Sequence, residues 1–271
     1  MFEGHIRDII VSAEYSVKIS DFLSPSEQRT AFDVALGEGA VDRCFFWGGV
    51  PEAERRRMVV IPDWMVPEQG ALGGAFSAER EETLREIAQS GADSGEIFAS
   101  AVALEISASS YTDLEHRDYL GSILALGVER SVIGDIAVTG GHSAIVFATE
   151  EGAKFLISAL DRVKNDAVST VRVELPESFR IPREYEVITD TVMSPRLDGV
   201  VRALCKISRE DAASLVLKGD VTLNYMTETK TDKLLVKGDV MSVRGYGKFI
   251  YDGDRGINRR GRLRIDARKY V

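Results

Sequence analysis

Two short stretches near the carboxyl end carry apolar residues at three- and four-residue spacing, which predicts helices that bury one face. These apolar residues are Leu197, Val200, Val201, Leu204, Ala212, Leu215 and Val216. Ser208 is well suited to cap the second helix, and Lys218-Gly219 is suited to end it. The apolar residues Val221 and Leu223 then alternate with polar ones, as in a strand. The pattern therefore predicts a helix pair packed on a hairpin.

The middle of the chain alternates strand and helix patterns in a regular order. We predict strands over residues 97–106, 135–138, 143–148 and 170–174, and helices over 113–126 and 150–162. The order βαββαβ is that of the ferredoxin-like plait, which RNA-recognition modules also use. Those modules stack bases on aromatic residues of the central strands, and here the strands offer mainly Phe98 and Phe147. RNA binding by this sheet is therefore the weaker hypothesis.

The amino-terminal part predicts a small domain of helices and strands. Helix patterns cover residues 6–19 and 25–36, and a strand over 43–47 is expected to pair with one over 58–61. Residues 66–98 predict a linker that holds one exposed helix, which begins after Ser77. We therefore expect an α+β, multidomain chain: an N-terminal α/β domain over 1–92, a ferredoxin-like (RRM-like) domain over 93–180 and a C-terminal domain over 181–271.

Gly48 and Gly49 precede three consecutive arginines, Arg55, Arg56 and Arg57. Two glycines followed by cations are suited to cradle a phosphate, although the Lys-Ser/Thr of a P-loop is missing. A turn that leads into a charged hairpin arm is the alternative interpretation, and we favour it.

Charge is divided unequally along the chain, whose formal net charge is −9. Residues 191–271 carry 17 Lys and Arg against 10 Asp and Glu, a net charge of +7. The preceding residues carry 17 against 33, a net charge of −16. A basic end on an acidic body is typical of a protein that binds a polyanion.

Cysteine and histidine are too scattered to build a disulfide framework or a metal cluster. Cys44 and Cys205 lie far apart in apolar surroundings, and His5, His116 and His142 form no ligand pair. We find no basic-then-apolar leader and no run of about 18 apolar residues. We therefore expect a soluble, cytoplasmic protein that uses no metal, no cofactor and no membrane.

Cations mark the predicted helix pair and sheet. Arg196 begins the first helix and Arg209 the second, and an arginine beside free N–H groups of a helix N-terminus makes a phosphate site. The further candidate RNA contacts are Lys218, Asn224, Lys230, Lys237, Arg244, Lys248, Arg259 and Arg260. The order Arg-Leu-Asp, Ser-Arg, Lys-Gly-x-Val-x-x-Asn and Gly-Asp resembles the alpha-L, or S4-type, RNA-binding motif. Tyr225 departs from that motif, which usually has glycine after the asparagine.

A second resemblance covers nearly the whole chain except residues 66–98. Gly48, Gly49, Ala53, Glu54 and Arg55 match a Gly-Gly-x-x-x-Ala-Glu-Arg segment, and a helical block beginning His116-Arg117-Asp118 follows it. In that block we expect Gly121 to allow close backbone approach and Gly127 to end the helix. Together with the C-terminal alpha-L domain, these blocks resemble the YlmH family of bacterial RNA-binding proteins.

The resemblance implies a ribosome-associated protein rather than an enzyme. Members of that family are similar to factors that engage the large ribosomal subunit and peptidyl-tRNA and are linked to rescue of obstructed nascent chains. The implied partners are structured RNA, ribosomal or transfer, and the large subunit, without specificity for DNA. Arg55, Arg56, Arg57, His116 and Arg117 form a second candidate contact.

Two other classes of function stay open. Arg196-Leu197-Asp198 imitates the segment with the catalytic aspartate of pseudouridine synthases, but Pro195 replaces its glycine, and a salt-bridging Asp198 is favoured. No Gly-x-Gly-x-x-Gly loop follows a strand, which argues against a methyltransferase. The third class is a protein-binding adaptor that uses the acidic body. 

The last residues mix glycine with arginine, which is compatible with a disordered arm that orders on RNA. Alternating Leu263 and Ile265 favour a final strand instead. We predict a basic loop over 252–261 followed by that strand.

Overall fold

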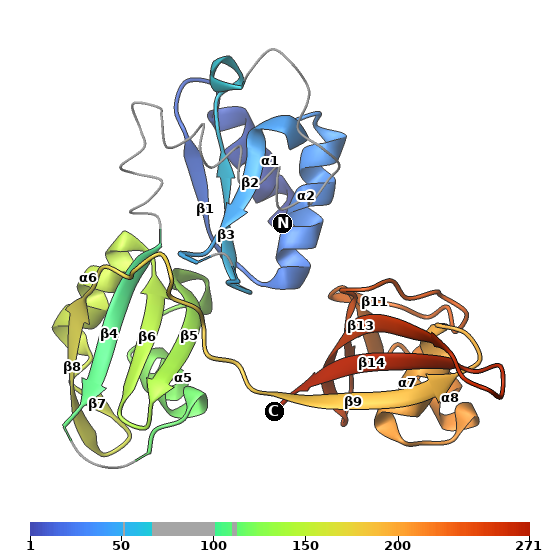
Figure 1. Cartoon of the computed structure of the whole chain (residues 1–271). Coiled ribbons are helices and arrows are strands. Elements are labelled where there is room, and N and C mark those ends of the chain that lie inside the picture. The colour runs from blue at the N-terminus through green and yellow to red at the C-terminus, as the bar shows by residue number, and fades with distance from the viewer. Residues whose placement is uncertain (51, 67–100, 110–112) are drawn as a thin grey trace. The chain divides into compact units, whose positions relative to one another are not determined.

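The structure is a computed structural model that describes residues 1–50, 52–66, 101–109 and 113–271 (Figure 1). The expected linker, its helix after Ser77, Phe98 and the expected boundary at 92/93 lie outside the described residues. Contacts divide the chain into two compact units, Met1–Pro182 and Arg183–Val271. Both units combine helices with antiparallel sheets, which confirms the general α+β class.

The amino-terminal elements form two helices and a three-stranded antiparallel sheet in the order β1-β3-β2. They are α1 (Phe2–Ser12), β1 (Lys18–Leu23), α2 (Pro25–Gly37), β2 (Cys44–Trp47) and β3 (Arg56–Val60). The predicted pairing of the last two strands is confirmed, with Phe45 opposite Val59. The predicted helix over 6–19 is wrong beyond Ser12. In the sequence, Val17 and Ile19 alternate with the polar residues Ser16, Lys18 and Ser20, and this two-residue period is typical of a strand such as β1.

The middle elements form a five-stranded sheet in the order β5-β6-β4-β8-β7. They are β4 (Val102–Ala108), α5 (His116–Ala125), β5 (Ile133–Gly140), β6 (Ser143–Ala148), α6 (Glu150–Ala159), β7 (Arg162–Val163) and β8 (Asp166–Arg172). The predicted order of strands and helices is confirmed, with the two-residue β7 added. Tyr119 of α5 and Leu156 of α6 are buried with Leu104 in one core cluster, so both helices pack on the sheet.

The two glycines of the α5 region behave differently from each other. Gly127 has a φ of +82° directly after α5, which confirms that it ends the helix. Gly121 was expected to allow a close approach, but a Cβ atom built there meets no heavy atom within 4 Å. That expectation is wrong, because the apolar residues of α5 point to the sheet while Gly121 lies on another face of the helix.

The second face of the middle sheet is covered within the same unit. Phe147 of β6 is 1% exposed and packs in a cluster with Phe22 and Val50 of the amino-terminal elements. Leu175 and Phe179, which follow β8, pack against the same cluster. Base stacking on Phe147 is therefore excluded in this arrangement, because its ring is buried.

The carboxy-terminal unit packs two helices on a six-stranded antiparallel sheet in the order β11-β10-β12-β13-β14-β9. Its elements are β9 (Tyr185–Val192), α7 (Leu197–Cys205), α8 (Arg209–Leu217), β10 (Val221–Leu223), β11 (Met226–Thr227), β12 (Val240–Val243), β13 (Gly247–Ile257) and β14 (Leu263–Tyr270). Leu197 and Val200 of α7 are buried with Phe249 of β13 in one core. The predicted helix pair is confirmed, and the predicted hairpin is part of this wider sheet.

The predicted loop over 252–261 is wrong up to Ile257 and confirmed for residues 258–261, and the final strand is confirmed. β13 continues through Ile257, which pairs with Leu263 of β14 across two irregularities in register. Gly253 and Gly256 have positive φ angles near these irregularities, as expected for bulged strands. The connecting turn is short because Asn258 Oδ1 accepts hydrogen bonds from the backbone N–H groups of Arg260 and Arg262. Glycine therefore shapes the strand here and does not end it.

A two-residue turn joins β10 to β11, with Leu223 opposite Met226. Asn224 and Tyr225 have φ angles of 47° and 67°, and two-residue hairpins require such positive values at both positions. Tyr225 therefore takes up the left-handed conformation that glycine adopts without strain. None of the described helices is long and apolar enough to cross a membrane.

Candidate nucleic-acid interface

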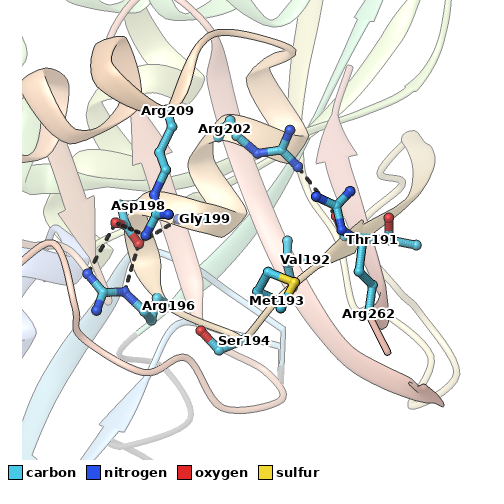
Figure 2. Close-up of a pocket in the computed structure, with 10 residues that line it drawn as sticks. All are labelled: Thr191, Val192, Met193, Ser194, Arg196, Asp198, Gly199, Arg202, Arg209 and Arg262. Atoms are coloured by element: carbon cyan, nitrogen blue, oxygen red, sulfur yellow. Dashed lines mark hydrogen bonds and ion pairs between the residues drawn. The ribbon is translucent and has the colours of Figure 1, made fainter. Parts of the chain in front are cut away.

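Four arginines line one pocket of the carboxy-terminal unit, which has a volume of about 180 Å³ (Figure 2). Its lining residues are Thr191, Val192, Met193, Ser194, Arg196, Asp198, Gly199, Arg202, Arg209 and Arg262. They come from the end of β9 and the residues after it, from α7, from the start of α8 and from the turn before β14. We call this site the arginine pocket.

The local fold explains why the arginines meet. Arg196 is the N-cap of α7, and Arg202 lies in the last turn of that helix. Lys206 follows α7 with a left-handed φ of 54°, which reverses the chain into α8. Arg209 then begins α8, and its Nη2 lies 3.6 Å from Oδ2 of Asp198. Arg262 reaches the pocket from the β13–β14 turn that Asn258 stabilises.

Asp198 is the buried negative charge of the arginine pocket, with a side chain 6% exposed. Its Oδ1 accepts hydrogen bonds from Nε of Arg196 at 3.1 Å and from the Gly199 N–H at 2.8 Å. Burial opposes ionisation, but the hydrogen bonds and charge of Arg196, the Gly199 N–H and the charge of Arg209 outweigh it. The pKa of the Asp198 carboxyl is therefore lowered.

The pocket combines four guanidinium groups with one carboxylate, which leaves three positive charges in excess. Guanidinium groups donate planar pairs of hydrogen bonds that match phosphate oxygens, and their charge persists at any physiological pH. Arg202 uses Nη2 to donate to the Thr191 carbonyl at 3.3 Å, which fixes its position at the pocket wall. The arrangement is therefore suited to bind a phosphate group.

The expected contribution of free N–H groups at the α7 N-terminus is wrong. The N–H groups of Leu197 and Asp198 donate to the carbonyl oxygens of Lys233 and Thr231 at 2.8 and 3.0 Å. The Gly199 N–H donates to Asp198 itself. Because the segment before β12 crosses this helix end and occupies its donors, any anion here is held by side chains.

The other predicted contacts are spread over the same unit. Lys218 caps the end of α8, and Arg244 is 84% exposed in the turn after β12, where its Nη1 lies 3.3 Å from Asp220. Arg259 and Arg260 lie in the exposed β13–β14 turn that also carries Arg262. The remaining predicted contacts in exposed or partly exposed positions are Lys230, Lys237 and Lys248.

Asn224 is bound within the protein. Its Nδ2 donates to Oδ1 of Asp239 at 2.8 Å, and its Oδ1 accepts from the Val240 N–H at 3.0 Å. These bonds tie the β10–β11 turn to β12. Both ends of the amide are therefore used in holding the sheet together.

Sequence reasoning missed Arg202 and Arg262 as members of the pocket. Arg202 lies six residues beyond Arg196, a spacing at which helix periodicity does not place two side chains on one face, so the pattern along α7 gives no sign that the two arginines meet. Arg262 belongs to a run of glycine and arginine that sequence reasoning assigned to a loop. The pairing of β13 with β14 up to Ile257 instead places Arg262 in a tight turn.

The glycines and arginines after β2 form a packed junction. This packing favours a turn that leads into a hairpin arm over a phosphate cradle, the two interpretations of this segment. A Cβ atom on Gly49, whose φ is +95°, would overlap the Phe147 ring. Arg55 donates from Nε to the Ile133 carbonyl at 3.0 Å and from Nη2 to the Phe22 carbonyl at 2.9 Å. Burial lowers the pKa of Arg55 against the opposing charges of Glu27 and Asp135. The phosphate cradle is wrong because carbonyl groups occupy these donors.

The neighbouring members of the second candidate contact also bind the protein itself. Nε of Arg56 donates to the Ala53 carbonyl, and Nε of Arg57 donates to the Ser20 carbonyl. Arg117 is 78% exposed, with its Nε 3.0 Å from Glu115 at the start of α5. Partial burial and the charge of Arg130 lower the pKa of His116. The structure therefore leaves Arg117 as the most accessible cation of this set.

This chain is similar to a described protein family and to a named bacterial protein. The family model described as "Putative RNA-binding domain in YlmH" matches residues 99–177, which contain the middle sheet and its two helices. A protein of Bacillus subtilis (strain 168) named "Ribosome-associated protein quality control protein P2" is 26% identical over 257 residues. That match covers 94% of this chain and 88% of the relative. The predicted resemblance to the YlmH family is confirmed.

A solved structure also carries the YlmH name. It is "Cell division protein ylmH from Streptococcus pneumoniae", which is 17% identical to this chain, with a TM-score of 0.45. The match covers 66% of this chain and 93% of the solved chain.

Proposed function

We propose that this chain is an RNA-binding protein that holds phosphates of structured RNA in the arginine pocket. The observation that carries the proposal is the convergence of four arginines, from α7, from α8 and from the β13–β14 turn, on one pocket with an excess of positive charge. Phosphate contacts supply most of the affinity in protein–RNA binding and need no base-specific groups. The description of the matched YlmH domain supports the same class of partner.

The proposal also includes the types of domain, the RNA partner and the cellular location. The carboxy-terminal unit acts as an S4-type domain, and the middle sheet with α5 and α6 is a ferredoxin-like plait. The partner is ribosomal or transfer RNA on the large ribosomal subunit in the cytoplasm, and the protein acts by binding rather than by catalysis. The name of the Bacillus subtilis relative, with its ribosome association, supports this choice.

Charge favours an assembled ribosome over free RNA. Residues 191–271 have a net charge of +7, whereas the preceding residues have −16. The acidic part repels phosphate wherever the two approach within a Debye length, about 8 Å at physiological salt. A partner with protein as well as RNA surfaces removes this conflict, because the acidic part can face protein or solvent.

The geometry of Asp198 argues against the alternative function as an RNA-modifying enzyme. Asp198, which imitates a catalytic aspartate, is bonded to Arg196 and the Gly199 N–H and is nearly buried. These bonds assign it to holding the arginines. A modification assay on added RNA separates this alternative, and salt-dependent RNA binding separates the adaptor alternative.

Gradient sedimentation of cell lysate tests the proposal with the full-length chain. The pocket variant combines Arg209→Ala with Arg262→Ala, because both side chains reach the pocket without anchoring Asp198 as Arg196 does. The control variant combines Arg7→Ala with Arg29→Ala, which removes equal charge from exposed positions of α1 and α2. Both chains carry the same tag and are run at low and moderate salt.

We expect the wild type and the control variant to sediment with large ribosomal subunits at both salt concentrations. The pocket variant is expected to move to the top of the gradient at moderate salt, because it has lost two phosphate contacts. A wild-type protein that stays at the top of both gradients contradicts the ribosome assignment.

A further inference from the structure

One face of the carboxy-terminal sheet packs on the helices, and the opposite face carries a row of tyrosines and cations. On β14 the buried residues Ile265 and Ala267 point to the helices, so Tyr270, which is an odd number of positions away, points to the other face. Tyr185 is the register partner of Tyr270 and shares that face. Lys248 precedes the buried Phe249 of β13 and therefore lies there as well.

The rings and cations of this face are in contact with one another. The Tyr185 and Tyr270 rings meet edge to face, with centroids 5.0 Å apart. The Lys248 ammonium lies 4.5 Å from the Tyr270 ring centroid and 5.0 Å from that of Tyr225. The three tyrosines thus span the sheet from its β9 edge to the β10–β11 turn. We call Tyr185, Tyr225, Lys248 and Tyr270 the tyrosine row.

A second cation, Arg268, lies at the Tyr185 end of the row, and it is bound to a carboxylate as well as to a ring. The Arg268 guanidinium lies 5.0 Å from the Tyr185 ring centroid. Its Nη2 and Nε donate to the Asp252 carboxylate at 2.8 and 2.9 Å. Asp252 therefore neutralises Arg268, whereas the Lys248 ammonium lies against the Tyr270 and Tyr225 rings, where it accompanies the groups proposed to stack bases.

The row is separate from the core that stabilises the unit. The core cluster contains Phe249 and Tyr251 of β13, together with α7 and α8, and lies on the other side of the sheet. All three tyrosines of the row stay partly exposed, as does Lys248. Partly exposed aromatic rings on the open face of a sheet, interleaved with cations, are the groups on which proteins stack unpaired bases.

We propose that the tyrosine row binds unpaired bases of an RNA strand, with Lys248 contacting the adjacent phosphate. This inference deepens the proposed function: the arginine pocket holds phosphates of structured RNA at one end of β9, and the tyrosine row selects single-stranded nucleotides at the other end of that strand. The base lies against the Tyr225 or Tyr270 ring in the place of the Lys248 ammonium, which moves to the phosphate. Every base has a flat face, so the row discriminates strandedness rather than sequence.

The experiment measures binding of the full-length protein to two labelled RNAs of equal length by fluorescence anisotropy. One is an unstructured uridine-rich strand, and the other is a blunt duplex. Tyr270→Leu and Tyr225→Leu remove the rings, and Tyr270→Phe keeps the ring without its hydroxyl. Tyr246→Leu is the matched control, because Tyr246 is a tyrosine 38% exposed in the β12–β13 turn outside the row.

We expect each leucine variant of the row to weaken binding of the single strand by about 5- to 100-fold, the loss of one base–aromatic stack. Binding of the duplex and the salt dependence should stay unchanged, because stacking involves no counterion release. Tyr270→Phe and Tyr246→Leu should bind both RNAs as the wild type does. Thermal unfolding of each variant shows whether the fold is retained.

Single-strand affinity that is unchanged in the leucine variants, or a loss that is equal for strand and duplex, overturns the inference. If Tyr270→Leu unfolds the protein, the comparison rests on Tyr225→Leu, whose ring projects from a turn. A different result would contradict the proposed function of the arginine pocket. In that case the pocket variant leaves the affinity and the salt dependence unchanged for both RNAs.

Discussion

Asp198 and Arg196 are joined by two hydrogen bonds, from Nε to Oδ1 at 3.1 Å and from Nη2 to Oδ2 at 3.2 Å. The two residues flank Leu197 at the start of α7, and the carboxylate is nearly buried while the guanidinium stays partly exposed. A buried carboxylate thus fixes an arginine that faces the pocket. Because the guanidinium is already held in place before RNA binds, less side-chain conformational entropy is lost on binding.

Substitution Asp198→Asn should destabilise the carboxy-terminal unit by about 1–3 kcal/mol at pH 7, because it removes charge-assisted hydrogen bonds. The folded-state pKa of Asp198 is lowered, so the ionised carboxylate contributes stability above its unfolded pKa of about 3.9. That contribution is lost as pH falls through the folded pKa. Urea unfolding from pH 7 to pH 3 should show the two proteins converging below about pH 4.

Asp33→Asn is the control for this comparison, because Asp33 forms an exposed ion pair with Arg29 on α2. Exposed pairs contribute little, so this variant should stay within about 0.5 kcal/mol of the wild type. A difference between wild type and Asp198→Asn that stays constant down to pH 3 contradicts the assigned role of the carboxylate.

The turn at Tyr225 predicts an unusual order of stability. Tyr225→Ala and Tyr225→Gly both remove the ring over Lys248, but glycine adopts a φ near 67° without strain, whereas alanine does not. The glycine variant should therefore be more stable than the alanine variant by about 1 kcal/mol. Urea unfolding of the two variants measures this difference, and an alanine variant of equal or greater stability would show that the turn is not left-handed.

Two glycines of the first unit should respond in opposite directions. Gly49→Ala places a Cβ against the Phe147 ring at a positive φ and should cost more than about 2 kcal/mol. Gly121→Ala in α5 meets open space and should stabilise the protein by roughly 0.5–1 kcal/mol. Thermal unfolding of both variants tests the packing of the junction, and a neutral Gly49→Ala would contradict it.

Local patterns predicted the helix pair and the middle elements well, because their signals lie within a few residues of each other. Ser208 Oγ accepts from the Asp211 N–H at 3.0 Å, as its sequence position before an apolar repeat predicted. Ser24 likewise caps α2, where it forms a capping box with Glu27.

Long-range features were not accessible to such patterns. The donors at the α7 N-terminus are occupied by carbonyls of Thr231 and Lys233, more than thirty residues away along the chain. The sequence makes Arg55 a candidate RNA contact, but its guanidinium is bonded to backbone carbonyls that lie far away along the chain. A charged side chain's partner depends on tertiary contacts, so the sequence identified the cations but did not assign them to a pocket or a junction.

The most direct test of the arginine pocket is the salt dependence of RNA binding by the full-length protein. Affinity for one structured RNA is measured at several salt concentrations for the wild type, the pocket variant and the control variant. Each phosphate contact contributes a slope of roughly 0.7–0.9 in the logarithmic plot. We predict that the pocket variant binds more weakly and that its slope falls by one to two, roughly as two lost contacts require, while the control variant matches the wild type. An unchanged affinity and slope for the pocket variant would contradict the account.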